Sequence, residues 1–134
     1  VATVTSSDQE PFRFLHIINP FISNDEVQIL NQRLTMTTLD IAKRFVEESA
    51  FLHSKIIVDV VAVVATTNIE SFSKTISWIP NSFKQYFIRA KTMAQCYNET
   101  SFNKPCTPPP LSDILSVGLS IKNYTHIIYT NMDM

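Results

Sequence analysis

Glycine is almost absent from this chain: its 134 residues contain a single one, Gly118. Phosphate-binding loops of the G-x-G-x-x-G and G-x-x-x-x-G-K-[ST] types need several glycines at fixed spacing, so both are excluded. Any nucleotide bound by this chain has to be held by other groups.

Cysteine, long apolar runs and an excess of one charge are also scarce. Cys96 and Cys106 are too few for a disulfide scaffold, and they either pair in an oxidising compartment or stay free thiols. The net charge of −1 predicts no general affinity for nucleic acid. The longest apolar run, residues 56–65, contains Asp59 and is too short to span a bilayer. Residues 1–7 lack the basic start and apolar core of a signal peptide. The sequence does not decide between the cytoplasm and the lumen of the secretory pathway.

The chain does have enough apolar residues, 45% of the total, for one folded domain over residues 1–134. Residues 1–12 are polar and predict a loose lead-in. Residues 103–110 are rich in proline and predict a stiff, extended connector. Because the chain starts without Met and stops on its candidate site, we expect it to be part of a longer protein.

The first element is a short strand over residues 13–19. It ends at Asn19-Pro20, because proline cannot donate a ladder hydrogen bond. Ser23 and Glu26 then form a capping-box pattern that predicts a helix start with Ser23 as the N-cap.

The helix that follows is expected to run to about Ala50 with an apolar stripe toward the sheet. The stripe consists of Val27, Leu30, Leu34, Ile41 and Phe45. The opposite, solvated face is expected to carry Gln28, Gln32, Arg33, Lys43, Arg44 and Glu47.

Residues 55–64 read as a second buried strand, which the intervening helix connects to the first as a parallel crossover. Asp59 inside it either faces a polar cavity or bonds to backbone or a cation in the core, because a buried carboxylate is costly unless paired. A short strand is expected around residues 86–88. Three nearby cations are either phosphate contacts or solvated charges: Lys84, Arg89 and Lys91.

A helix is predicted over residues 111–121, with Leu111, Ile114, Leu115 and Gly118 on one face. Glycine costs about 1 kcal/mol against alanine in a helix, so we expect Gly118 to allow close approach to the sheet. The order of elements predicts an α/β fold with a mostly parallel sheet flanked by helices.

The last stretch, residues 125–134, reads as a strand buried on both faces. Residues i and i+2 share a face of a strand, so Asn131 and Asp133 project together from its carboxyl end. Ligands bind at that end in open α/β sheets. An amide and a carboxylate suit a divalent cation that carries phosphate oxygens. The alternative is a strand that runs into an Asx-stabilised turn.

Together, this order of elements, the Pro-rich approach, the P-L-S-D-I-L helix and the final H-I-I-Y-T-N-M-D-M resemble the N-terminal, nucleotide-sugar-binding half of a GT-A type glycosyltransferase. The tail resembles the D-x-D motif of that family in an N-x-D form. The resemblance implies a single, incomplete Rossmann-like half-domain that binds a nucleotide-sugar donor, with Mn²⁺ or Mg²⁺ as cofactor.

Residue roles follow from the resemblance alone. Asp133 corresponds to the carboxylate that binds the cation, and Asn131 to a position that contacts the ribose or the water shell of the metal. Asn19 and Pro20 stand where this family contacts the nucleotide. Asp113 either reaches the ribose or caps its helix. The acceptor half and the catalytic residues of the family correspond to sequence after Met134, so sugar transfer by these residues alone is not expected.

Two other functions stay open. One is a nucleotidyltransferase-like protein that binds Mg²⁺ and a nucleoside triphosphate. The other is a non-catalytic α/β interaction domain, with partner contacts at Trp78, Phe83, Tyr86 and Phe87. The three histidines lack metal-ligand spacing. Asn98-Glu99-Thr100 and Asn123-Tyr124-Thr125 match the N-glycosylation acceptor pattern, which also arises often by chance.

Overall fold

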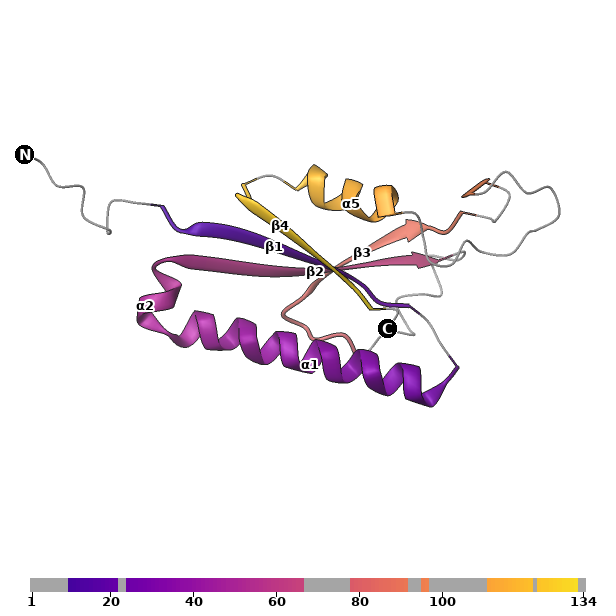
Figure 1. The fold of residues 1–134 in the computed structure, drawn as a ribbon, viewed down its shortest axis with the longest axis horizontal. Helices are drawn as coiled ribbons and strands as arrows, with labels where there is room; N and C mark the ends of the chain where they lie inside the picture. Colours follow the sequence, from indigo (N-terminus) through magenta and orange to yellow (C-terminus); the bar gives the residue numbers. More distant parts are fainter. Residues whose placement is uncertain are drawn as a thin grey trace, which may run out of the picture.

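The computed structural model describes residues 10–21, 24–66, 78–91, 95–96, 111–121 and 123–132. Their main elements, in order, are β1 (Phe12–Asn19), α1 (Glu26–Glu48), α2 (Ala50–His53), β2 (Ile56–Thr66), β3 (Lys84–Arg89), α5 (Leu111–Ser120) and β4 (His126–Asn131) (Figure 1). Most of the predicted lead-in and all of the predicted connector lie outside the described residues.

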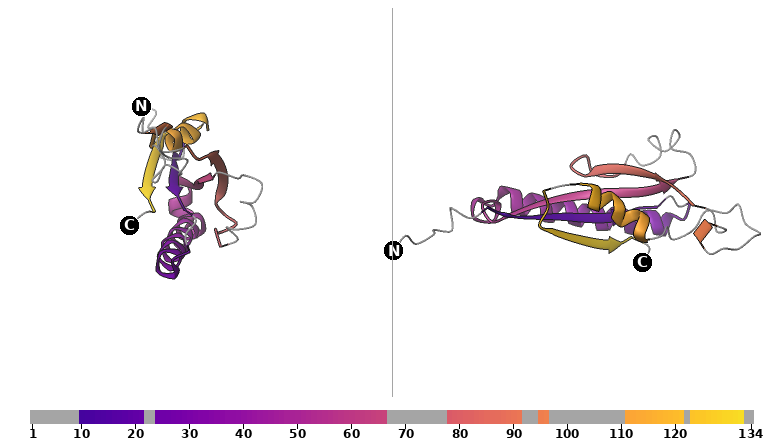
Figure 2. Two further views of the ribbon diagram at one scale, coloured as in Figure 1. Left: turned by 90° about the vertical axis from the view of Figure 1, so that its right-hand side faces the viewer. Right: turned by 90° about the horizontal axis from the view of Figure 1, so that it is seen from above.

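In the described part of the chain, four strands form one sheet in the order β3-β2-β1-β4, and each neighbouring pair is parallel. The chain lays down β1, β2 and β3 in one direction and then places β4 on the free side of β1. Helix α1 covers one face of the sheet and α5 covers the other (Figures 1 and 2). The predicted fold class, α/β with a parallel sheet flanked by helices, is confirmed.

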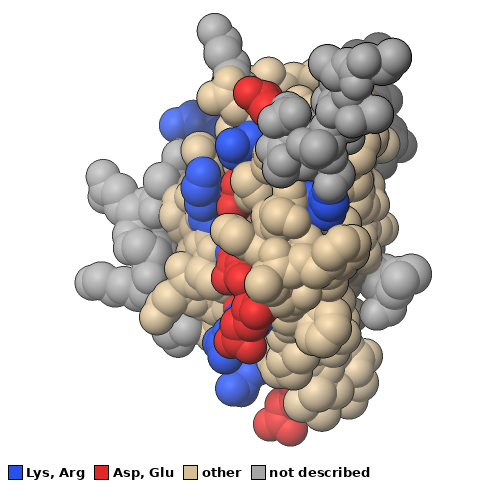
Figure 3. Space-filling view, turned by 90° about the vertical axis from the view of Figure 1, so that its left-hand side faces the viewer, with Lys and Arg blue, Asp and Glu red and all other residues tan. Residues whose placement is uncertain are grey.

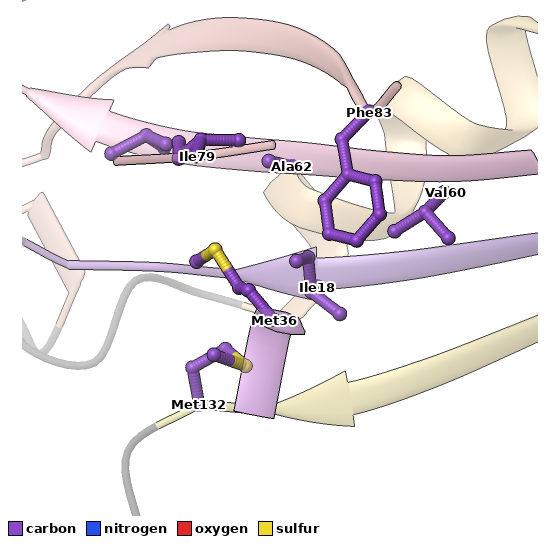
Figure 4. Close-up of a cluster of buried hydrophobic side chains, with 8 residues drawn as sticks. Ile18, Met36, Val60, Ala62, Ile79, Phe83 and Met132 are labelled. Atoms are coloured by element: carbon purple, nitrogen blue, oxygen red, sulfur yellow. The ribbon is translucent and has the colours of Figure 1, made fainter. Parts of the chain in front are cut away.

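Strand residues alternate between two separate cores, as the period of two in a β-strand requires. Beneath α1, the buried cluster drawn in Figure 4 consists of Ile18, Met36, Val60, Ala62, Val64, Ile79, Phe83 and Met132. Beneath α5, it consists of Leu15, Ile17, Val61, Val63 and Ile114. Phe83, proposed above as a partner contact, is therefore a core residue.

Gly118 brings α5 close to the sheet, as predicted. A Cβ atom built on Gly118 would lie 2.2 Å from Cδ1 of Ile17 and 3.4 Å from its Cγ1. Real Cβ atoms do not approach other atoms so closely, so the side chain of Ile17 fills the space that any larger residue would need.

Helix α1 is turned the other way from the prediction. All members of the predicted sheet-facing stripe are between 55% and 67% exposed. The residues that face inward are Gln32, Met36 and Asp40. Two of these residues have polar partners in the rest of the fold: Gln32 binds the backbone after β1, and Asp40 accepts a hydrogen bond from Ser82. The spacing of apolar residues along the helix gives no information about such partners. Although α1 has 23 residues, neither it nor any other described helix is long and apolar enough to cross a membrane.

Two local predictions also need correction. The N-cap of α1 is Asp25, whose carboxylate accepts a hydrogen bond from Val27 N over 2.9 Å, instead of Ser23. Strand β4 is not buried on both faces, because it forms an edge of the sheet and leaves Ile127 and Ile128 each 42% exposed.

Candidate functional site

The candidate site lies at the carboxyl ends of β1 and β4, where the strand order reverses. These two strands are neighbours in the sheet although β2 and β3 lie between them in the sequence. The position where β1 meets β4 is therefore the topological switch point of the sheet. Asn19 ends β1, Asn131 ends β4, and the parallel register places the two residues side by side. Ligands of open α/β sheets bind in the crevice at this position.

The two asparagines differ in burial. Asn19 is 3% exposed, and its Oδ1 atom has no hydrogen-bond partner among the described residues. Asn19 follows Leu15 and Ile17 in strand alternation, so its side chain extends on the α5 side of the sheet. Asn131 is exposed at the same edge. A buried, unpaired polar atom costs about 1–3 kcal/mol, and a donor from a ligand would remove that cost.

Pro20 and Phe21 continue from Asn19 and are held in place by α1. Pro20 is fully buried. The side-chain amide of Gln32 accepts from Phe21 N over 2.9 Å and donates to Phe21 O over 3.0 Å. Sequence reasoning placed Gln32 on the solvated face. The one feature of the sequence that could have indicated this inward position is the chemistry of glutamine. Its side-chain amide offers both a donor and an acceptor, which the C=O and N–H of a single backbone residue need.

Asp113 lies in the first turn of α5, which begins at the same edge of the sheet (Figure 1). Its carboxylate binds the ammonium group of Lys91, with distances of 3.0 Å from Oδ2 and 3.1 Å from Oδ1. Lys91 is therefore paired with Asp113 while its side chain stays 46% exposed, and a phosphate contact by Lys91 stays one of the two alternatives. A ribose contact by Asp113 stays a prediction, and its carboxylate retains capacity for another donor.

Asp133 lies outside the described residues. The residue before it, Met132, is 5% exposed and packs in the core beneath α1 near Ile18 and Met36 (Figure 4). The chain therefore remains attached to the sheet beyond the last paired residue of β4, and does not leave for solvent at Asn131.

Asp59 and His16, two polar residues inside the strands, each bond to a side chain that is distant in sequence. The hydroxyl of Tyr124 donates to Asp59 Oδ2 over 2.6 Å, a partner that neither of the two expected alternatives, a polar cavity or a backbone group or cation in the core, had named. Burial and the hydrogen bond to Asp59 raise the pKa of Tyr124 to about 12. His16 Nε2 lies 2.7 Å from Thr130 Oγ1, and burial lowers the pKa of His16 below its ordinary 6.5.

The described residues offer no cluster of metal ligands. No group of three or more His, Cys, Asp or Glu side chains that could hold an ion is found in the part of the chain that the structure describes. Cys96 is disulfide-bonded, and the sequence contains one other cysteine, Cys106, which lies outside the described residues. The arrangement at the carboxyl edge is therefore suited to hydrogen bonding of a ligand through amides and backbone groups.

Comparisons of the chain with protein-family models, with characterised proteins and with solved structures gave no match.

Proposed function

We propose that this chain is the donor-binding portion of a glycosyltransferase that takes its sugar from a nucleotide sugar. The observation that carries the proposal is the pairing of Asn19 with Asn131 at the switch point, with Asn19 Oδ1 buried and without a hydrogen-bond partner among the described residues. A ligand that donates an N–H or O–H to this oxygen gains a hydrogen bond whose desolvation cost the folded protein already bears.

The proposal includes a divalent cation at the end of β4. Asn131 and Asp133 would hold it, because amide and carboxylate oxygens are the donors that Mg²⁺ and Mn²⁺ prefer. When bound, the cation supplies Lewis-acid stabilisation of the diphosphate that leaves as the glycosidic bond breaks. The single carboxylate at this N-x-D position is expected to give weaker metal affinity than a pair.

The remaining roles belong to neighbouring residues. Asn19 accepts a hydrogen bond from the base or ribose, and Pro20 forms the wall next to it. Gln32 keeps that wall fixed through its two bonds to the next backbone residue, Phe21. Asp113, neutralised by Lys91, is available to a ribose hydroxyl at the start of α5.

A specific observation favours a second candidate, a non-catalytic interaction domain. The apolar stripe on α1 is exposed, and Phe51 in α2 is 71% exposed. Exposed apolar side chains gathered on one helix face are typical of protein-binding surfaces. This candidate requires no ligand at the carboxyl edge, so nucleotide binding separates the two.

The test is calorimetric titration of the 134-residue chain with uridine and guanosine diphosphates, with and without Mn²⁺. We expect metal-dependent binding of a nucleoside diphosphate and no sugar transfer. Asp133→Ala should abolish the metal dependence. Asn19→Leu should weaken binding about tenfold, equivalent to ~1.4 kcal/mol. Asn31→Ala, on the exposed side of α1, is the matched control and should bind like the parent.

Each other outcome points elsewhere. Absence of binding to any diphosphate, or unchanged metal dependence in Asp133→Ala, refutes the proposal and leaves the interaction domain. Preference for nucleoside triphosphates over diphosphates and nucleotide sugars indicates the nucleotidyltransferase-like alternative. Sugar transfer by these residues alone would contradict the expectation that the acceptor half is required.

A further inference from the structure

Residues 123–125 connect α5 to β4 at the amino edge of the sheet, away from the candidate site. Asn123 is exposed and adopts a left-handed backbone conformation with φ of 80°. Asparagine is among the few residues other than glycine that tolerate this region. The fold thus holds Asn123 in a turn with its side chain in solvent.

The two residues after Asn123 anchor this turn. Tyr124 binds Asp59 through its hydroxyl. Thr125 Oγ1 accepts from Arg13 N and donates to Arg13 O, both over 3.0 Å. These contacts are made by Tyr124 and Thr125 and do not involve the side-chain amide of Asn123.

The surroundings of Asn123 can accommodate a bulky polar group. An open pocket of about 560 Å³ adjoins the turn and is lined by Glu10, Pro11, Phe12, Arg13, Asn123, Tyr124 and Thr125. Figure 3 views the molecule from this side and shows acidic and basic side chains close together in one band, with uncharged surface beside it.

The disulfide at Cys96 is an independent observation that points to the same modification. Disulfides persist in oxidising compartments such as the lumen of the secretory pathway. Glycosylation of Asn-x-Ser/Thr takes place in that compartment, and Asn123-Tyr124-Thr125 matches the acceptor pattern.

The position of the turn also keeps a glycan clear of the candidate crevice. Asn123 precedes β4, and Asn131 ends it. The 6 residues of β4 rise by ~3.3 Å each, which separates the two ends of the strand by roughly 20 Å. Modification of Asn123 is therefore compatible with ligand binding, and this inference does not depend on the proposed function.

We propose that Asn123 is an N-glycosylation site. In the reaction, the amide nitrogen of Asn123 forms a bond to the anomeric carbon of a lipid-diphosphate-linked oligosaccharide. The bond from that carbon to the diphosphate oxygen breaks, the lipid diphosphate leaves with the electron pair, and the amide nitrogen loses one proton. The host oligosaccharyltransferase catalyses the transfer on the nascent chain, and the folded turn then holds the glycan in solvent.

The test is secretion of the chain from a eukaryotic host behind a cleavable leader, followed by peptide mapping with and without an N-glycosidase. Trypsin cleaves after Lys122, which separates the Asn123 sequon from the one at Asn98. We expect Asn123 to be converted to Asp by the glycosidase, which reports a glycan at that residue. Wild-type chain suffices for this readout, so it does not depend on the folding of any variant.

Variants at the turn give matched controls. Asn123→Gly and Asn123→Asp both tolerate a positive φ and remove the acceptor, so each should be secreted without the modification. Thr125→Ser retains both the acceptor pattern and the hydroxyl that binds Arg13, so it should remain glycosylated. Secreted chain with unmodified Asn123, or a glycan that persists on this peptide in Asn123→Gly, would overturn the proposal.

Discussion

Gln32 in the second turn of α1 binds both backbone polar groups of Phe21, two residues beyond the end of β1. These two hydrogen bonds connect the longest described helix to the backbone that follows Asn19 at the candidate site. They also explain why α1 turns a glutamine inward and leaves leucines outside, because the partly buried backbone of Phe21 needs hydrogen-bond partners.

Gln32→Leu tests this connection. The variant leaves the N–H and C=O of Phe21 without partners, so we expect the free energy of unfolding to fall by roughly 2–4 kcal/mol. Urea-induced unfolding followed by circular dichroism measures the change. Asn31→Leu, on the exposed side of the same helix turn, should stay within about 0.5 kcal/mol of the parent. Equal losses in both variants would mean that Gln32 contributes helix propensity alone.

The orientation of α1 predicts opposite stability effects for two of its apolar residues, Met36 and Leu34. Met36 is fully buried, and Met36→Ala should lower the free energy of unfolding by about 2–5 kcal/mol. Leu34 is 57% exposed, and Leu34→Ala should change it by less than about 0.5 kcal/mol. Thermal or urea unfolding measures both. If the stripe containing Leu34 faced the sheet, the order of the two effects would be reversed.

The contact between Gly118 and Ile17 predicts a coupled pair. Gly118→Ala should destabilise the protein by about 1–3 kcal/mol through overpacking, despite the better helix propensity of alanine. Ile17→Val removes the Cδ1 atom that the new methyl group would meet. The double variant should therefore lose less stability than the sum of the two single changes. An additive double-mutant cycle would show that the helix and strand are not in tight contact.

His16 predicts how stability depends on pH. Its pKa in the folded protein is lowered by burial, so the unfolded chain takes up a proton first as the pH falls. The contribution of His16 to stability is complete above the unfolded pKa of about 6.5 and is lost as the pH falls through the folded pKa. Urea titrations between about pH 5 and 8 should show this slope.

His16→Gln should reduce that slope, because glutamine keeps a polar partner for Thr130 but does not titrate. His53→Gln, at an exposed position in α2, is the control and should leave it in place. An unchanged slope in His16→Gln would mean that other groups cause the loss of stability in acid.

Much of the fold follows from local pattern. The strand runs, the crossover lengths and Gly118 predict a parallel sheet covered on both faces, and the structure has this arrangement. The ends of β1 and β4 follow from Pro20 and from the polar residues after Tyr129, and their register brings the predicted Asn19 and Asn131 together. These features depend on residues close in sequence or on rules of chain connection.

Features that depend on single long-range polar contacts could not be predicted. Helix α1 has apolar residues at helical spacing on the side that faces solvent, so periodicity selects the wrong face. The partner of Asp113 is Lys91, 22 residues earlier, and the partner of Asp59 is Tyr124, 65 residues later. Strand β4 reads as fully buried because apolar content does not distinguish an edge strand from a central one.

Asn19 is expected to trade stability for ligand binding. Asn19→Leu replaces a buried amide, whose Oδ1 has no partner in the described chain, with an apolar side chain of similar size. The free energy of unfolding should rise by about 1 kcal/mol, because the desolvated oxygen is gone. The same change should weaken nucleoside diphosphate binding about tenfold, equivalent to ~1.4 kcal/mol.

Asn131→Leu separates these two effects. Asn131 is exposed, so its replacement should weaken binding without raising the free energy of unfolding. Urea unfolding and calorimetry on the two variants measure both quantities. A destabilised Asn19→Leu would mean that the amide makes an essential structural contact. A stabilised variant with full nucleotide affinity would mean that the oxygen is not a ligand contact. A gain in stability together with a loss of nucleotide binding is the result that fits a ligand contact by Asn19. If Asn19 had no such role, its replacement by leucine would raise the free energy of unfolding without weakening binding.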